Sequence, residues 1–386
     1  MDTVNQILFI LILVILFFCS GQFYFVFRAL KIDSKKEPED TDFTPPVSIL
    51  KPLRNLDPEL YQNLQAFCQL DYPSYEIIFC FKDNTDPAFE IVDRLKKENH
   101  HFPIKIVIDS TFYGFNPKVD NLISGIKVAE NDLILISDGD IRPHSSYLKE
   151  IIPFFKNPDV GLVNNLIRGD GNLSLGAIFE NLHLNSFIIG TVCTTKYAFG
   201  HPAVIGKSML LRKSDLDKMG GIFAFKDYLA EDYIIGRRLH KMGKKVIISN
   251  RMLTTINHSR PFSKFWNRHR RWQKIRSRLH VPAYISELLL NPIFFALIYL
   301  FTSIFSTNAF LFFLIVVIFK TALDATQGKM VNKNLNLLTY LFVPVKDLLM
   351  IVLWLTPFFK GTVTWRKQEL RIKKYTELTS INEKSA

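Results

Sequence analysis

Cysteine is scarce in this sequence: the 386 residues include four, and no two of them form a CxxC pair. They are spread along the chain at Cys19, Cys68, Cys80 and Cys193. Zinc sites and disulfide frameworks use closely spaced cysteines, so this distribution argues against a zinc site and fits a reducing compartment. The chain also lacks an internal repeat and a low-complexity tract, which argues against a repeat architecture.

No lysine or arginine precedes the first apolar run, residues 7–27. A cleaved signal peptide is therefore the weaker interpretation, because such peptides begin with a basic segment. The run is uncharged and long enough to cross a hydrocarbon layer of roughly 30 Å. Four basic residues follow it directly: Arg28, Lys31, Lys35 and Lys36. The positive-inside rule then places the N-terminus outside and the following domain in the cytoplasm.

Acidic residues are absent from the most basic stretch, Arg260 to Arg278, which holds eight lysines and arginines. The chain as a whole has a formal net charge of +12. A nucleic-acid patch is one interpretation of this stretch. Its position just before an apolar region favours contact with lipid headgroups or a substrate diphosphate instead. We therefore expect neither a nucleic-acid partner nor a protein partner.

Two apolar tracts, residues 7–27 and most of 285–359, divide the chain. The roughly 240 residues between them suffice for one sizeable α/β core. The predicted organisation is a transmembrane anchor (1–30), a linker (31–46), a cytoplasmic α/β domain (47–255), amphipathic basic interface helices (256–284), transmembrane or re-entrant helices (285–360) and a basic cytoplasmic-type tail (361–386).

Strand-like and helical patterns alternate after the linker. The predicted strands are Val47–Leu50, Glu76–Phe81, Ile104–Ile108 and Leu133–Ser137. The predicted helices are Pro58–Gln69, Pro87–Asn99 and Lys118–Glu130. This alternation indicates an α/β fold with a mostly parallel, buried sheet. In such sheets ligands bind outside the carboxyl ends of the strands.

The C-terminal apolar region permits two topologies. Ile285–Phe319 is long enough for two short spans, broken near Ser306-Thr307-Asn308. Leu335–Phe359 has the charged pair Lys346-Asp347 at its centre, which is costly in mid-bilayer. A re-entrant or interfacial hairpin there would keep the basic tail inside, whereas a third span would place it outside. Both alternatives stay open.

Two carboxylates one residue apart, Asp138 and Asp140, follow the buried strand Leu133–Ser137. At the carboxyl end of a strand they can share a hard divalent cation, Mg²⁺ or Mn²⁺, and such a cation can bridge a diphosphate. The alternative is a turn in which Asp138 only caps the next helix.

Acids also follow the strand Glu76–Phe81, where Asp83 and Asp86 can accept hydrogen bonds from a nucleotide base or ribose. Alternatively, Asp86 is only the N-cap of a helix begun by Pro87. Further along, Glu231 and Asp232 offer a general base for an acceptor hydroxyl. Acids in the first turn of a helix also favour its macrodipole without any catalytic role.

Arginines and a tryptophan occur together in Arg268-His269-Arg270-Arg271-Trp272. Guanidinium groups stabilise a leaving diphosphate, and tryptophan stacks on an acceptor or lies at a membrane interface. The alternative is a solvated amphipathic helix on anionic lipid, and the two interpretations are compatible.

The order and spacing of these four groups resemble the layout of processive-type family-2 glycosyltransferases. Nearly the whole chain is similar to the ceramide glucosyltransferase family, glycosyltransferase family 21, and we expect a bacterial member of it. The matching segments are Val47–Leu53, Asn116–Leu122, Leu211–Lys213 and Ala230–Tyr233. The resemblance implies a GT-A (Rossmann-like) nucleotide-sugar-binding domain with an N-terminal transmembrane helix and C-terminal transmembrane or interfacial helices.

The resemblance also implies roles for single residues. Asp86 is expected near the uridine, Asp138 near the metal and diphosphate, and Asp232 as the catalytic base. Arg271 and Trp272 close the Q/R-x-x-R-W motif, with Arg268 in its variable first place. The expected donor-binding set is Pro52, Asp83, Asp86, Lys118 and Asp138.

Two features depart from the family pattern. Asp140 completes a DxD that animal members match less well, so its metal ligation is expected to be firmer here. The segment Tyr197–Ala203 is this chain's own version of an acceptor-proximal loop. His201 and Glu231 are the acceptor-proximal candidates, although a lone histidine is more often structural.

The predicted function is that of a multi-pass membrane enzyme, an inverting, metal-dependent glycosyltransferase. It would move a hexose, glucose by default, from a UDP-sugar to the primary hydroxyl of a membrane lipid, with ceramide the expected acceptor. UDP-GlcNAc and UDP-galactose stay open as donors. The alternatives are a hopanoid or diacylglycerol acceptor, a polysaccharide synthase, which would need more spans for its channel, and a catalytically silent nucleotide-sugar binder.

Overall fold

The computed structural model describes residues 3–40, 42–171, 173–200, 203–359, 362–365 and 368–380. The chain separates into two packing units. The helical unit comprises Met1–Ile32, Arg168–Phe199 and Asn257–Glu369. The sheet unit comprises Asp33–Ile167, Gly200–Ile256 and Leu370–Ala386. These units differ from the predicted domains in two places, because residues 168–199 pack in the helical unit and the tail from Leu370 belongs to the sheet unit.

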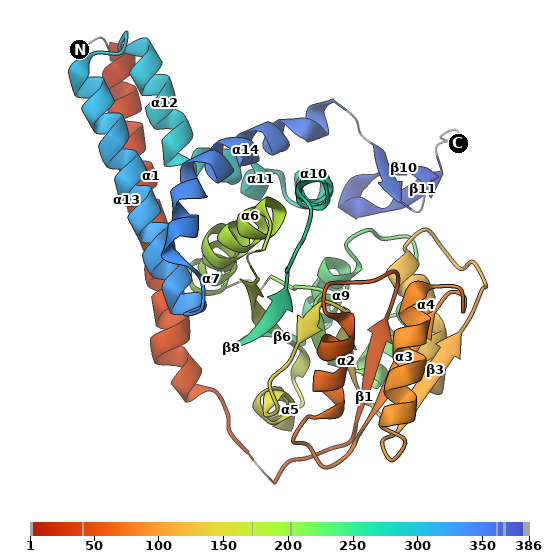
Figure 1. The fold of residues 1–386 in the computed structure, drawn as a ribbon. Helices are drawn as coiled ribbons and strands as arrows, with labels where there is room; N and C mark the ends of the chain where they lie inside the picture. The colour runs from red at the N-terminus through yellow and green to blue at the C-terminus, as the bar shows by residue number, and fades with distance from the viewer. Residues whose placement is uncertain are drawn as a thin grey trace. The chain divides into compact units, whose positions relative to one another are not determined.

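An eight-stranded sheet with the order β3-β2-β1-β4-β7-β6-β8-β5 organises the fold (Figure 1). Its strands are β1 Val47–Pro52, β2 Tyr75–Phe81, β3 Ile104–Ile108, β4 Leu133–Ser137, β5 Ile141–Arg142, β6 Val160–Asp170, β7 Ser208–Arg212 and β8 Lys245–Ile256. The predicted parallel pairing is confirmed for the first four strands. The other half is antiparallel, since β7 runs against both β4 and β6, and β5 runs against β8.

Helices cover both faces of this sheet. On one face the apolar core includes side chains of α2 (Leu60–Cys68), α3 (Pro87–Glu98) and α5 (Tyr147–Ile151). On the other it includes side chains of α4 (Pro117–Val128), α8 (Lys213–Lys218) and α9 (Glu231–Lys241). Each large side chain fully removed from water, such as Phe67 or Phe79, contributes about 1.5–3 kcal/mol.

The predicted elements of the first half-sheet have ends within two residues of those observed. Their helix starts follow from local chemistry. The Asp86 carboxylate accepts a hydrogen bond from the Ala88 amide at the start of α3, and Asn116 caps α4 in the same way. Proline occupies the first helical position of both, where no amide donor is needed.

The segment predicted as a linker is held against β8 within the sheet unit. Glu37 accepts hydrogen bonds from the Ser249 hydroxyl, at 2.8 Å, and from the Asn250 amide. Glu39 pairs with Arg251 at 2.5 Å. The carboxylates of Glu37 and Glu39 therefore fix the predicted linker, which its composition alone describes as charged and irregular.

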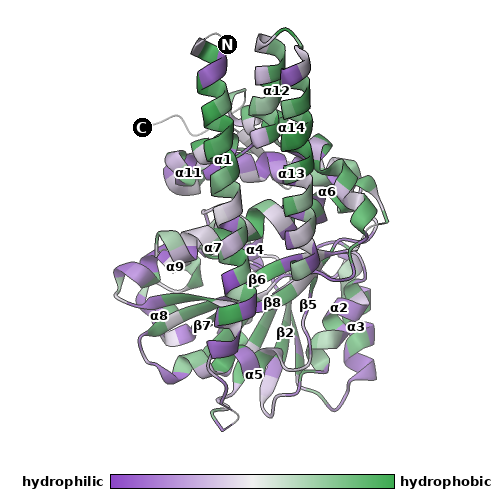
Figure 2. Cartoon of the chain, turned by 90° about the vertical axis from the view of Figure 1, so that its left-hand side faces the viewer, coloured by the Kyte–Doolittle hydropathy of each residue, from purple (hydrophilic) through white to green (hydrophobic). Residues whose placement is uncertain are grey.

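Apolar helices dominate the helical unit, as the hydropathy colouring shows (Figure 2). Helices α1 (Thr3–Phe27), α12 (Pro292–Thr302) and α13 (Thr307–Val331) lie side by side around a shared apolar cluster (Figure 1). Among the described residues, three helical stretches are long and apolar enough to cross a membrane, Thr3–Lys36, Thr307–Val331 and Leu337–Phe358. The pair α11 (Val281–Leu289) and α12, bent by 54°, would make a fourth.

The region predicted as either a hairpin or a third span is one helical stretch, Leu337–Phe358, which contains α14 (Val343–Leu355). Charged side chains of α13 lie beside its central charges, and the choice between a hairpin and a third span stays a prediction. Lys346 pairs with Asp347 at 2.6 Å and lies 3.6 Å from Asp324. Lys320 pairs with Asp324 at 2.6 Å and lies 3.7 Å from Asp347.

Candidate active site

The ends of several strands meet at one edge of the sheet. Because β1, β2 and β4 are parallel, their carboxyl ends, and with them Pro52 and Asp138, share this edge. Strand β7 is antiparallel to β4, with Ser208 opposite Ser137, so it begins where β4 ends. The residues just before β7, Gly206 and Lys207, therefore reach the same edge.

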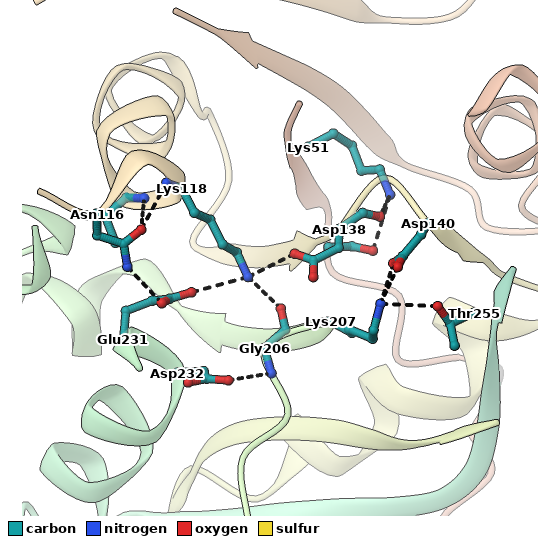
Figure 3. Close-up of polar contacts among 12 residues, drawn as sticks. Lys51, Asn116, Lys118, Asp138, Asp140, Gly206, Lys207, Glu231, Asp232 and Thr255 are labelled. Carbon is teal, nitrogen blue, oxygen red and sulfur yellow. Dashed lines mark hydrogen bonds and ion pairs between the residues drawn. The ribbon is translucent and has the colours of Figure 1, made fainter. Parts of the chain in front are cut away.

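Lys118, in the first turn of α4, links three groups at this edge (Figure 3). Its ammonium lies 2.9 Å from Asp138 Oδ1 and 3.3 Å from Glu231 Oε1. It also donates to the carbonyl of Gly206, at 2.7 Å. Burial alone would lower the pKa of Lys118, but Asp138, Glu231 and Asp232 together raise it above its ordinary value. The lysine is therefore a fixed cation between the predicted donor acid Asp138 and Glu231, the residue next to the predicted base.

Glu231 and Asp232 begin α9, and each is held by partners from other parts of the sheet unit. The Asn116 amide donates to Glu231 Oε2 at 2.9 Å. Asp232 Oδ2 accepts from the backbone amide of Gly206 at 2.8 Å. A Cβ at Gly206 would lie 2.7 Å from that oxygen, so only glycine allows this approach.

Burial raises the pKa of Asp232 to about 7, and the neighbouring Glu231 adds to this rise, while Lys118 and two backbone amides oppose it. A carboxylate that titrates near neutral pH is suited to accept a proton from a hydroxyl. Asp232 is half-buried, which leaves part of its side chain accessible to a substrate.

Asp140 has a different environment from Asp138. The Lys207 ammonium lies 2.5 Å from both Asp140 oxygens and 3.1 Å from the Thr255 hydroxyl (Figure 3). Both side chains are buried, with 9% of Asp140 and 8% of Lys207 exposed. The two carboxylates of the DxD are therefore bound to different lysines.

The predicted metal fits this edge through Asp138. Its side chain is 34% exposed, and Mg²⁺ is commonly held by one or two carboxylates together with substrate phosphates. Within the part of the chain that the structure describes, no three His, Cys, Asp or Glu side chains converge. Metal ligation by Asp140 stays a prediction, and it would require Lys207 to move from the carboxylate.

The other residues predicted to bind the nucleotide-sugar donor do not belong to the group of side chains joined by Lys118. Asp86 caps α3 and also accepts from the Asn55 amide, with both oxygens at 3.0 Å. Asp83 is exposed and accepts from the amide and hydroxyl of Thr85. Pro52 is the last residue of β1. The capping interpretation of Asp86 is confirmed, and its role near a uridine stays a prediction.

The Arg-x-x-Arg-Trp motif lies on α10 (Phe262–Leu279) of the helical unit. Arg268 lies 3.5 Å from the buried Glu180 and 4.6 Å above the Trp272 ring. Burial opposes ionisation of Glu180, but Arg268 and His269 lower its pKa to about 2. Arg268 thus orders the motif, while Arg271 and Trp272 are half-buried. His201 lies outside the described residues.

Sequence reasoning missed two lysines of the site. Lys51 is fully buried, and its ammonium donates to the Asp138 carbonyl at 2.7 Å and lies 3.7 Å from the Phe67 ring centre. Burial lowers the pKa of Lys51 to about 7. A lysine inside an apolar strand is a signal that would have found it. Lys207 carries no such signal, because only the pairing of β7 with β4 brings it to the edge.

Residues near the C-terminus also contact this site. The Thr376 hydroxyl accepts from the Ala230 amide at 3.1 Å, and its carbonyl accepts from Leu229 at 2.9 Å. The Arg237 guanidinium lies 4.2 Å from the Tyr375 ring centre. The tail predicted only as basic therefore fixes the chain immediately before Glu231.

The architecture matches that of a solved glycosyltransferase. A mannosyltransferase from Pyrobaculum calidifontis, in complex with GDP-Man and Mn²⁺, aligns over 92% of this chain and 99% of its own, with a TM-score of 0.55 and 16% identity. At that identity the likeness shows the fold alone. It confirms the predicted GT-A fold.

Two curated relatives are similar to this chain over most of its length. Ceramide glucosyltransferase 1 of Caenorhabditis elegans is 29% identical over 91% of this chain and 75% of its own length. Ceramide glucosyltransferase 3 of the same organism is 32% identical over 62% of this chain and 52% of its own. A bacterial source stays a prediction. The profile of glycosyl transferase family 21 matches residues 8–378, and the chain therefore belongs to this family of glycosyltransferases.

Proposed function

We propose that this glycosyltransferase transfers glucose from UDP-glucose to the primary hydroxyl of ceramide, with inversion at the anomeric carbon. One observation carries the proposal: Lys118 joins the half-buried carboxylate of Asp138 to Glu231 at the start of α9, next to Asp232. Donor and acceptor groups would therefore meet at one edge of the sheet. The names of the relatives supply the lipid and the sugar.

On the donor side, Asp138 would hold a divalent cation, Mg²⁺ or Mn²⁺, which neutralises the diphosphate. Lys51 supports this arrangement, since its hydrogen bonds to the Asp138 carbonyl and the Ser137 hydroxyl fix the turn that presents the carboxylate. Lys118 holds the Asp138 side chain from the other side.

On the acceptor side, Asp232 takes the proton of the lipid hydroxyl. The hydroxyl oxygen then bonds to the anomeric carbon as the bond from that carbon to the diphosphate oxygen breaks, and UDP leaves with the electron pair. Hydrogen bonds from the Gly206 and Tyr233 amides orient the Asp232 carboxylate. Its pKa of about 7 lets it both accept and release a proton near neutral pH.

The predicted roles of Arg271 and Trp272, and the cytoplasmic orientation of the sheet unit, belong to the same proposal. The basic residues after α1 support that orientation through the positive-inside rule. Three candidate spans support integration in the membrane.

The test is UDP release by the purified full chain with Mn²⁺, over a grid of UDP-glucose, UDP-GlcNAc and UDP-galactose against ceramide, diacylglycerol and a hopanoid. Turnover confined to UDP-glucose and ceramide is expected, and the product should have the inverted anomeric configuration by NMR. Turnover with another lipid would replace ceramide as acceptor. Bound UDP-sugar without any transfer would indicate a silent binder.

Asp232→Asn separates these outcomes further. The variant should bind UDP-glucose normally and lose transfer by roughly 10²–10⁴-fold, the usual contribution of a general base. Asp217→Asn, at an exposed position of α8, is the matched control and should retain full activity. Transfer by Asp232→Asn at the wild-type rate would refute the assignment of the base.

A further inference from the structure

A small cavity of about 30 Å³ lies inside the helical unit, remote in sequence from the acids of the sheet edge. Its lining residues come from α6 (Leu175–His183), the π-helical segment after it (Leu184–Ile188), α10, α11 with the two residues that follow it, and from α13 and α14. The polar ones are His183, Gln273, Glu287, Asn291, Lys320 and Asp347, and the apolar ones are Phe187, Leu290, Met350, Ile351 and Trp354.

Polar atoms on this lining lack partners. His183 is 2% exposed, and neither of its ring nitrogens has a hydrogen-bond partner among the described residues. Gln273 Oε1 likewise has no hydrogen-bond partner among the described residues. The His183 ring is stacked on Phe187, with centroids 5.2 Å apart. Burial lowers the pKa of His183 well below its ordinary value, so its neutral ring offers one donor and one acceptor.

Buried polar groups without partners are rare, and each costs roughly 1–3 kcal/mol. Their presence on one cavity wall indicates that something else supplies the missing hydrogen bonds. The unpaired atoms are Gln273 Oε1, which is an acceptor, and the two ring nitrogens of His183, of which one donates and one accepts. The complementary ligand must therefore carry both a donor and an acceptor.

The charged groups around the cavity balance one another. Three cations face three carboxylates in this part of the described structure, namely Lys320, Lys346 and Arg276 with Asp324, Asp347 and Glu287. A phosphate would need an excess of cations, and a metal ion would need an excess of carboxylates. The balance therefore favours a neutral ligand.

Size and position restrict the ligand further. A cavity of about 30 Å³ accommodates one or two water-sized groups, which excludes a sugar ring or a nucleotide. Two of the helices that line it, α13 and α14, belong to stretches that qualify as membrane spans. Ionisable residues within such stretches usually mark a functional site. A polar group of a membrane lipid meets all of these conditions.

We propose that this cavity binds the neutral amide group of a membrane lipid, with His183 and Gln273 as hydrogen-bonding partners. The inference rests on the proposed function for the class of lipid, and it adds which chemical groups are recognised and by which residues. An amide supplies the N–H donor and the carbonyl acceptor that these side chains require. An ester lipid has no N–H donor.

Equilibrium binding of a short-chain fluorescent ceramide to the full chain in nanodiscs, without UDP-sugar, tests the proposal. Unlabelled ceramide should compete, diacylglycerol should compete about tenfold less well, and phosphatidic acid should not compete. His183→Phe should weaken ceramide binding about tenfold, because the ring keeps its shape but loses both nitrogens. His183→Gln, which retains a donor and an acceptor, should weaken it less.

A substitution that fills the cavity provides a second test of the proposal. Ile351→Phe occupies the cavity and should abolish lipid binding, whereas Val352→Phe, at the neighbouring exposed position, should not change it. Binding of UDP-glucose by every variant shows that the protein is folded. Unchanged ceramide binding in both His183→Phe and Ile351→Phe would mean that the cavity holds only water, and it would overturn the proposal. Equal competition by phosphatidic acid would overturn it as well.

The same experiment distinguishes this inference from the proposed function. Asp232→Asn should bind ceramide as the wild type does. Ceramide binding at the cavity without glycosyl transfer would refute the proposed function and leave the inference intact. Transfer to ceramide with normal binding by the His183 and Ile351 variants would refute the inference alone.

Discussion

The sheet unit and the helical unit each contain a cluster of lysines and carboxylates, and the two clusters differ in balance. At the sheet edge, four acids (Asp138, Asp140, Glu231 and Asp232) face three lysines (Lys51, Lys118 and Lys207). Around α13 and α14, two lysines face two acids, all of them buried. The first cluster has a half-buried carboxylate, Asp138, and an acid, Asp232, whose pKa is raised to about 7, while the second cluster is buried and has no net charge.

This difference shows what separates a reactive cluster from a structural one. Ion pairs occur in both, so pairing alone does not identify chemistry. An unbalanced charge at an accessible strand end can be completed by a substrate or metal. A balanced buried set has nothing left to bind except neutral groups that need hydrogen bonds.

The largest effect, on thermal stability, is expected from removing one charge of the balanced cluster around α13 and α14. Lys346→Met removes a lysine that is 1% exposed and leaves Asp347 without its closest cation. Removal of one partner of a buried ion pair costs about 3–5 kcal/mol. The midpoint of thermal unfolding in nanodiscs should fall accordingly, whereas Lys333→Met, at an exposed position, should leave it unchanged. An unaltered midpoint for Lys346→Met would show that this cluster does not stabilise the fold.

The next effect concerns Lys118. Lys118→Met leaves Asp138 and Glu231 without their shared cation, and we expect transfer to fall by roughly 100-fold, or about 2.7 kcal/mol in the activation barrier. Lys118→Arg should recover part of this loss. Steady-state kinetics with UDP-glucose and ceramide measure it. A loss confined to KM, with kcat unchanged, would mean that Lys118 only binds the donor.

The ionisation of Asp232 determines the expected pH dependence of kcat/KM. Because its pKa is raised to about 7, the base is protonated below that pH, and kcat/KM should rise about tenfold per pH unit up to the midpoint and then level off. Glu231 contributes to the raised pKa, so Glu231→Gln should move the midpoint to lower pH. A midpoint near 4 in the wild type would contradict the buried environment assigned to Asp232.

The smallest effect, on kcat, is expected from Thr376 in the C-terminal tail. Thr376→Val removes one hydrogen bond to Ala230 and should cost about 0.5–1.5 kcal/mol, expressed as a loss of kcat of up to roughly tenfold if the α9 start shifts. Thr376→Ser keeps the hydroxyl and should behave as the wild type. Equal activity of the Val and Ser variants would show that the hydroxyl does not position Asp232.

Sequence predicted the first four strands, the helices between them and the DxD at a strand end, because local apolar patterns and caps decide those features. It also placed Lys118, Asp138, Glu231 and Asp232 at the site, and the structure brings these side chains together. Contacts made by distant segments were not predictable. Lys207 reaches Asp140 only through an antiparallel strand, and Thr376 reaches Ala230 across 146 residues.

The contact of Thr376 with the α9 loop has a consequence for biosynthesis. A ribosome makes Thr376 after α13 and α14, so both apolar helices have left the peptidyl-transferase centre before Thr376 can contact Ala230. The sheet unit is thus assembled from segments made before and after two of the candidate membrane spans, Thr307–Val331 and Leu337–Phe358. The two helices are therefore synthesised before the contact that completes the loop preceding Asp232 can form.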